Sequence, residues 1–177
     1  MYPFLRMIKE MTVHSRAERL PLTGTHVSHH ICWPWDLDMW MELNNGRTLT
    51  IFDLGRIPLA QRVGLIGALA RNRWGLTMAG ATVMYRRRVR IFDKVETRSR
   101  AIGWDEKFIY IEQSMWKGDT CTSHVLYRSA VTGKSGIVPP HRVLAEMGQP
   151  DTTSPALPDW VTGWIEADRH RPWPPEM

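Results

Sequence analysis

The hydrophobic pattern divides the chain into a helical N-terminal half and a strand-rich C-terminal half. Residues 1–20 predict a short amphipathic helix, which carries on one side Phe4, Leu5, Ile8 and Met11. From Thr25 to Trp35 the apolar positions alternate, which predicts a first strand. One face of that strand would carry Val27, His29, Ile31, Trp33 and Trp35.

Two helices are predicted next. Asn44-Asn45-Gly46 is typical of a helix start, because an Asn side chain can cap the amides two or three residues ahead. Residues 47–56 then predict a helix that is apolar around most of its circumference, so we expect it to be buried on several sides. Pro58 suits the first turn of a second helix, which we expect to run to about Asn72.

After Gly75 the pattern becomes that of long strands joined by tight turns. The predicted strands cover 76–89 (with a bend or bulge at Gly80), 94–104, 108–116 and 120–131. A short helix is predicted over 142–147, and the Pro- and Trp-rich tail beyond Gln149 should lie over the surface or a partner. One long, curved antiparallel sheet wrapped around one central helix buries that apolar helix most simply.

The sequence therefore predicts an α+β hotdog fold. We expect a single domain over 1–177, with a core of about 25–135 and with an N-terminal helical segment and a C-terminal helix and tail appended. Hydrophobic residues make up 43% and charged residues 23% of the chain, which is typical of an ordered globular protein. Nine Trp and ten Met could line an apolar cavity, although such residues more often fill cores and subunit interfaces.

Cysteine and histidine positions argue against disulfides and metal. Cys32 and Cys121 are too few for a disulfide framework and indicate buried thiols in a reducing compartment. His29 and His30 are neighbours that a strand would point to opposite faces, so no metal site is expected. Arg6 and Lys9 interrupt the apolar residues of the N-terminus, which excludes a typical secretory signal. With no membrane span expected either, we predict a cytoplasmic location.

The chain is basic, with a formal charge of +5 and a pI near 9.6. This charge suits nucleic acid, an anionic membrane surface or a phosphate-bearing molecule such as coenzyme A. The densest run, Arg86-Arg87-Arg88 with Arg90, fits a charged sheet edge and phosphate binding equally well. Because no aromatic residues interleave that run, we expect no nucleic-acid partner.

Three carboxylates, Asp36, Asp38 and Glu42, lie directly before the start of the predicted buried helix. A helix N-terminus presents unpaired amides and a partial positive charge, which can polarise a thioester carbonyl and stabilise the oxyanion formed from it. A carboxylate opposite that carbonyl can attack it or deprotonate a water molecule. From spacing alone, carboxylates that merely solvate a loop are an equally good interpretation.

The segment also resembles the signature of hotdog thioesterases, both the 4-hydroxybenzoyl-CoA type and the plant fatty acyl-ACP type. The latter carry Asp-x-Asp-x-Asn-x-His-x-Asn-Asn at the entry to the central helix. Four residues fall on that pattern without a gap: Asp36, Asp38, Asn44 and Asn45. Residues 102–112 also resemble bacterial thioesterase-family hotdog proteins, and the likeness covers about residues 25–135.

This chain departs from the pattern where Trp40 and Glu42 replace its Asn and His. The acyl-ACP enzymes also place Glu and Cys after a Tyr-Arg-Arg run, where this chain has Arg88 and Val89. The resemblance therefore implies Asp38 as the main catalytic carboxylate, with Glu42 as a second candidate if it faces the cavity. The predicted substrate-binding residues are Trp40, Asn44, Asn45, Gly46, Arg47 and Tyr85. Inside the helix, Asp53 should form an ion pair with Arg56 or Arg47, because an unpaired buried charge is costly.

The resemblance implies an acyl-CoA thioesterase that releases a free carboxylic acid and coenzyme A, with acyl-ACP as another possible substrate. Coenzyme A would be part of the substrate, and no separate cofactor is expected. The alternative is a non-catalytic module that binds acyl thioesters or lipids. As in other hotdog proteins, we expect a homodimer or homotetramer with a substrate tunnel at the subunit interface.

Overall fold

The computed structural model describes residues 2–175. Its elements in chain order are α1 (Phe4–His14), β1 (His26–Ile31), the short 3-10 helix η1 (Pro34–Asp36), α2 (Asn45–Arg62), α3 (Leu65–Asn72), β2 (Gly75–Tyr85), β3 (Lys94–Trp104), β4 (Ile109–Lys117), β5 (Thr120–Gly133), β6 (Gly136–Val138), α4 (Pro140–Glu146) and α5 (Asp159–Arg169). None of the helices within 2–175 is long and apolar enough to cross a membrane.

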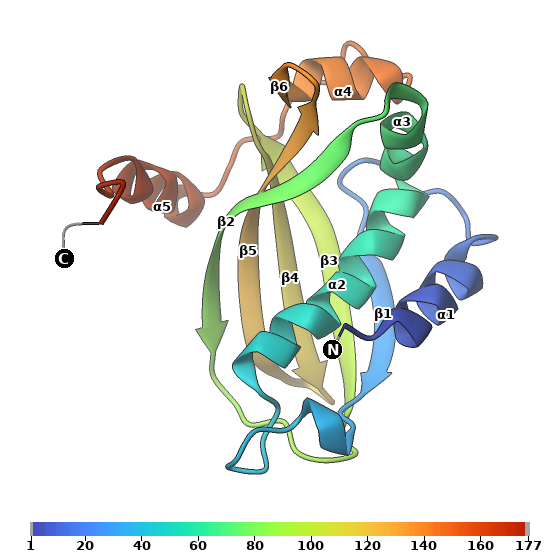
Figure 1. Ribbon diagram of the computed structural model, residues 1–177, viewed down its shortest axis with the longest axis vertical. Coiled ribbons are helices and arrows are strands. Elements are labelled where there is room, and N and C mark those ends of the chain that lie inside the picture. Colours follow the sequence, from blue (N-terminus) through green and yellow to red (C-terminus); the bar gives the residue numbers. More distant parts are fainter. Residues whose placement is uncertain (1, 176–177) are drawn as a thin grey trace.

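The strands form one antiparallel sheet that curls around α2. Its order is β1-β3-β4-β5-β2, with the short β6 also paired to β5. Figure 1 shows α2 crossing the concave side of this sheet. Ile51, Phe52 and Leu54 of α2 are almost completely buried there, although they lie on different sides of the helix. This arrangement confirms the predicted α+β fold with a long curved sheet around a central helix.

The predicted boundary between the two helices was wrong. Pro58 does not begin a second helix; it lies inside α2, which continues to Arg62. The residues that follow it, Leu59 and Ala60, are buried, so their packing offsets the hydrogen bond that a proline cannot donate. The break comes instead at Gly64, whose φ of +88° is readily adopted by glycine.

The first strand is shorter than predicted and faces the other way. It ends at Ile31, and Pro34 to Asp36 form η1. The buried positions are His26, Ser28 and His30, whereas Val27 and His29 are exposed. Helix α1 also buries a different face from the predicted one, because its buried residues are Met7 and Glu10.

The expected apolar face of α1 points largely to solvent, with Leu5 84% exposed. The physical reason is that α1 lies beside β1 and α2, where hydrogen bonds and ion pairs hold it. Arg6 bonds to Asp36, and Glu10 lies 3.9 Å from His30. Hydrophobic periodicity alone cannot predict a contact made by buried polar groups.

Strand β2 ends earlier than predicted, at Tyr85, so the arginine run beginning at Arg86 follows the strand rather than lying within it. The predicted irregularity at Gly80 is confirmed, since the pairing of β2 with β5 shifts register between Met78 and Gly80. Beyond Gln149 the chain forms a helix that we did not predict, α5. Its Val161 is buried in a cluster with Tyr110 and Leu126.

Candidate functional site at the start of the central helix

Asp36 is buried and fully engaged in holding the loop before α2. Its carboxylate accepts hydrogen bonds from Arg6 at 2.8 Å, from Arg47 at 2.6 Å and from the Trp33 amide at 3.1 Å. Burial by itself raises the pKa of this carboxyl, but the hydrogen bonds from Arg47, Trp33 and Arg6 outweigh it and lower the pKa below its usual value. Asp36 therefore stays ionised, and its bonds to Arg6 of α1 and Arg47 of α2 connect both helices to the loop.

Asp38 stands at the base of a tight turn. Its Oδ1 atom accepts hydrogen bonds from the amides of Trp40, at 2.9 Å, and Glu42, at 3.3 Å. The Asp38 amide donates to the Glu42 carbonyl at 2.8 Å, so the turn is closed by the main chain as well. Trp40, near the tip, is 70% exposed. The two carboxylates of the Asp-x-Asp motif thus differ: Asp36 is buried among cations, and Asp38 is half-buried and oriented by amides.

Asn44 caps the N-terminus of α2. Its Oδ1 accepts hydrogen bonds from the amides of Gly46 at 2.9 Å and Arg47 at 3.2 Å, while the Thr48 amide bonds to its carbonyl. The amides expected to hold a thioester carbonyl, those near Gly46 and Arg47, are therefore already occupied. The Asn45 amide has no hydrogen-bond acceptor in the described part of the chain. It is therefore the amide in the first turn of α2 that is available to a ligand.

A pocket of about 260 Å³ opens beside this helix start. It brings together three of the predicted site residues, Glu42, Asn45 and Tyr85. The remaining lining residues are Leu43, Thr48, Arg86, Arg87, Arg88, Val89, Thr122 and Ser123. The other predicted site residues, Asp38, Trp40, Asn44, Gly46 and Arg47, lie nearby in the chain but do not line it.

Two contacts fix the pocket wall. The Tyr85 hydroxyl donates to the Asn45 carbonyl at 3.2 Å, which ties the end of β2 to the start of α2. The Glu42 carboxylate forms an ion pair with Arg88 at 3.0 Å and is only partly buried. Glu42 is thus one of the residues that line the pocket, with its carboxylate paired to Arg88.

The arginines that follow β2 give this end of the molecule a cationic rim. Arg86, Arg87 and Arg88 are all exposed, and they also line an adjoining hollow of about 560 Å³ with Lys117, Thr120 and Thr122. Sequence reasoning missed the residues from β5, because they are far from the motif in sequence and only the fold brings them to it. Within residues 2–175 no cluster of side chains is suited to hold a metal ion.

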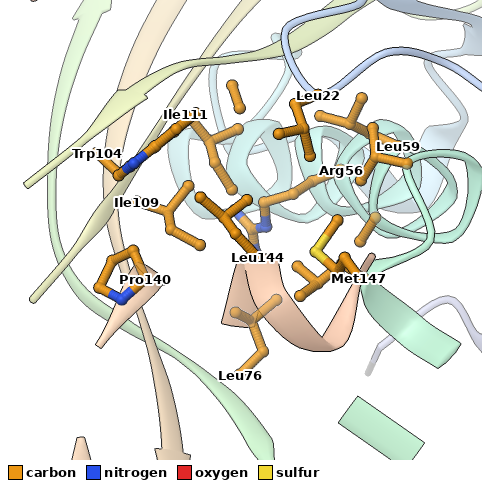
Figure 2. Close-up of a pocket in the computed structure, with 14 residues that line it drawn as sticks. Leu22, Arg56, Leu59, Leu76, Trp104, Ile109, Ile111, Pro140, Leu144 and Met147 are labelled. Carbon is orange, nitrogen blue, oxygen red and sulfur yellow. The ribbon is translucent and has the colours of Figure 1, made fainter. Parts of the chain in front are cut away.

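A second, apolar cavity lies beside the other half of α2 and was not predicted (Figure 2). It has a volume of about 50 Å³. Its lining residues come from α2, α3, α4, the sheet and the loop before β1: Leu22, Arg56, Leu59, Ala60, Val63, Leu65, Leu76, Ala101, Trp104, Ile109, Ile111, Pro140, Leu144 and Met147. Arg56 also forms the expected ion pair with Asp53. Burial raises the pKa of the Asp53 carboxyl despite the opposing effect of that guanidinium.

Comparisons with known proteins agree with this architecture. The chain is 34% identical over 147 residues to protein THEM6 of Xenopus laevis, a match that covers 82% of this chain and 69% of that protein. Among solved structures, it resembles the probable thioesterase YbaW of Escherichia coli with a TM-score of 0.64 at 13% identity, over 72% of this chain and 99% of that one.

A second structural relative is the hypothetical protein SAV2348 of Staphylococcus aureus, solved in complex with CoA. Its TM-score is 0.63 at 11% identity, over 81% of this chain and 96% of that one. At such identities these structures support the fold alone. The family comparison reaches further, because residues 32–165 match the thioesterase-like superfamily. That span includes the whole motif before α2 and strands β2 to β6 of the curled sheet, and the chain belongs to the thioesterase-like superfamily of hotdog proteins.

Proposed function

We propose that this protein hydrolyses acyl-CoA thioesters to a free carboxylic acid and coenzyme A. The observation that carries the proposal is the pocket at the N-terminus of α2, where a carboxylate, an unoccupied helix amide and a cationic rim meet. Family membership supports the same reaction class. The carboxylate would be Asp38 or Glu42, and both are placed close to the helix start.

In this proposal the thioester carbonyl lies at the Asn45 amide. The carboxylate takes a proton from a water molecule whose oxygen bonds to the carbonyl carbon, and the amide stabilises the oxyanion that forms. When this intermediate collapses, the carbon–sulfur bond breaks and the departing thiolate takes up the proton. Alternatively, the carboxylate attacks the carbonyl carbon directly, and the carbon–sulfur bond breaks to release the thiolate. Water then hydrolyses the mixed anhydride, which regenerates the carboxylate and supplies the proton that the thiolate takes up.

The cationic rim suits the phosphates of coenzyme A. Arg86 and Arg87 have exposed side chains next to the pocket, and Lys117 lines the adjoining hollow. Guanidinium groups bind phosphate through charge-assisted hydrogen bonds. The CoA complex of the related Staphylococcus aureus protein is in keeping with this assignment.

Two variants identify the carboxylate. Asp38→Asn and Glu42→Gln are each assayed on a panel of acyl-CoAs. The variant that has lost the catalytic base should show a turnover lower by about two orders of magnitude or more. Both substitutions keep side-chain size and remove charge. Glu106→Gln, in an exposed turn, is the matched control and should retain activity. If both site variants hydrolyse acyl-CoA as fast as wild type, the proposed site is wrong.

A non-catalytic acyl-thioester or lipid-binding module is the second candidate. It is favoured by the Glu42–Arg88 ion pair, which occupies one of the two candidate carboxylates, and by the Asn44 cap, which occupies the Gly46 and Arg47 amides that the sequence assigned to the thioester carbonyl. Calorimetric binding of acyl-CoA by wild type without any release of free thiol would support this alternative. Thiol release that depends on Asp38 or Glu42 would exclude it.

A further inference from the structure

Two loops at the end of the molecule that carries the candidate site display large apolar side chains to solvent. They are the loop between η1 and α2, residues 37–44, and the loop between β2 and β3, residues 86–93. Figure 1 shows both loops beyond the ends of the strands, at the bottom of the view. The Leu43 amide donates to the Val89 carbonyl at 2.8 Å, so the loops form one continuous surface. The exposed apolar side chains of these loops and of η1 make up a loop patch: Trp35, Met39, Trp40, Met41, Ile91 and Phe92.

Two residues of the loop patch have a backbone conformation that bulky residues rarely adopt. Met41 has a φ of +59° and Phe92 a φ of +62°. Asparagine and aspartate enter this left-handed region far more readily than large apolar residues do. Both side chains are nevertheless held in solvent, Met41 61% and Phe92 59% exposed. Because folding alone would favour a small polar residue at either position, a partner outside the chain is the better explanation for them.

Cations that have no acidic partner lie in the second of these loops. Arg86, Arg87 and Arg90 are exposed, and no carboxylate among the described residues forms an ion pair with them. Arg88 differs, because it is paired with Glu42. The loop patch therefore combines exposed apolar side chains with uncompensated positive charge.

A bilayer that contains anionic lipids matches both features. Tryptophan and other apolar side chains are favoured at the boundary between headgroups and acyl chains, while arginine is attracted to anionic headgroups. A second copy of the chain fits less well, because a symmetric pair through this surface would bring the same arginines together. The substrate does not account for the patch either, since none of its six side chains lines the pocket or the adjoining hollow.

We propose that the loop patch docks on an anionic membrane surface, with Met41 and Phe92 inserted among the lipids and the arginines at the headgroups. Docking does not depend on the hydrolysis proposed above, because it requires no reaction. It would hold the pocket close to the lipid surface, since Glu42 and Arg86 line that pocket and belong to the same two loops.

Co-sedimentation with vesicles tests the docking. The protein is mixed with vesicles of phosphatidylcholine alone, or of phosphatidylcholine with about one part in three of phosphatidylserine. Wild type should partition onto the anionic vesicles about tenfold or more strongly than onto the neutral ones. Arg90→Gln, which removes one exposed cation, should weaken that partition by about fivefold. Wild type that stays in solution with anionic vesicles, or binds both kinds equally, would overturn the proposal.

The double variant Met41→Asn/Phe92→Asn tests the apolar contribution. Binding to anionic vesicles should fall by about tenfold or more, because two apolar side chains no longer enter the lipid. Its stability in urea should at least equal that of wild type, because asparagine suits a positive φ. Arg73→Asn is the matched control: it has a φ of +55° and is exposed at the end of α3, at the opposite end of the molecule (Figure 1). This control should bind vesicles as wild type does.

Light scattering distinguishes a membrane from a second copy as the occupant of the loop patch. The double variant should have the same mass in solution as wild type. A smaller mass, together with no vesicle binding by wild type, would assign the patch to self-association and refute membrane docking. Met39→Gln changes a side chain that is 82% exposed and gives a second measurement if the double variant does not fold. It should weaken vesicle binding by about fivefold, and unchanged binding would contradict the proposal.

Discussion

At the scale of single residues, the two aspartates of the motif have different surroundings. Asp36 is completely buried between Arg6 and Arg47, whereas Asp38 is half-buried and bonded to turn amides. Removing the charge of Asp36 leaves two arginines facing each other, which is far more costly than removing an exposed ion pair. Because their side chains are identical, only their burial separates a structural role from a candidate catalytic one.

We therefore expect Asp36→Asn to lower the free energy of unfolding by about 3 kcal/mol. Asp38→Asn should change it by less than about 1 kcal/mol, because turn hydrogen bonds near the surface contribute little. Urea unfolding of both variants checks the difference. Equal stabilities for the two variants would contradict the structural role given to Asp36.

At the scale of elements, β1 turns a polar face inward. His26 and His30 are buried there, with His26 Nδ1 3.1 Å from Arg62 and His30 Nε2 3.0 Å from Ser28. Burial, followed by the charges of His14 and Arg62, lowers the pKa of His26 to about 4. Burial, followed by nearby cations of which Arg6 contributes most, lowers the pKa of His30 to about 3. Both rings are neutral in the folded protein at neutral pH.

This predicts a loss of stability on mild acidification. The unfolded chain takes up these protons below a pH of about 6.5, whereas the folded chain takes them up only near 4 and 3. Between those values the unfolded state binds more protons, so the free energy of unfolding falls as pH falls, by roughly 2 kcal/mol per histidine at pH 5.

Urea unfolding at pH 7 and pH 5 measures this effect. His30→Gln should reduce the difference between the two pH values, because glutamine does not titrate. His29→Gln, on the exposed face of the same strand, should leave it unchanged. If His30→Gln shows the full wild-type loss, the acid sensitivity arises elsewhere.

At the scale of the whole molecule, β1 and β2 form the two edges of the curled sheet. An unpaired edge presents free amides and carbonyls for another strand. Met84 and Tyr85, near the end of β2, are exposed beside the candidate site. We propose that two copies pair through this edge, so that the site lies close to the partner subunit.

Light scattering at micromolar concentration should then give twice the chain mass of 20.5 kDa, or four times if dimers pair again. Met84→Lys places a charge on the β2 edge and should shift the protein towards monomer. His29→Lys makes a comparable change on β1, the opposite edge, and should leave the assembly intact. A monomeric wild type would contradict the proposal.

Local sequence signals determined much of the fold. Asn44-Asn45-Gly46 predicted the start of α2, because side-chain capping depends on adjacent residues. Gly80 predicted the irregularity in β2, and the alternation over 94–104 predicted β3 with its observed bounds. The Asp-x-Asp spacing likewise predicted carboxylates close to the helix start, because so few residues separate them from it.

Only the tertiary structure decided what each of these groups contacts. Helix α2 continues beyond Pro58 because the next residue, Leu59, is buried. Asp36 has a structural role because arginines from α1 and α2 form ion pairs with it. The inward face of β1 is polar because α1 and α2 supply partners such as Arg62 for His26. The cavity at Arg56 needs residues from α2, α3, α4 and the sheet together. Periodicity records which side chains favour burial, but the partners of a buried polar group come from segments distant in sequence.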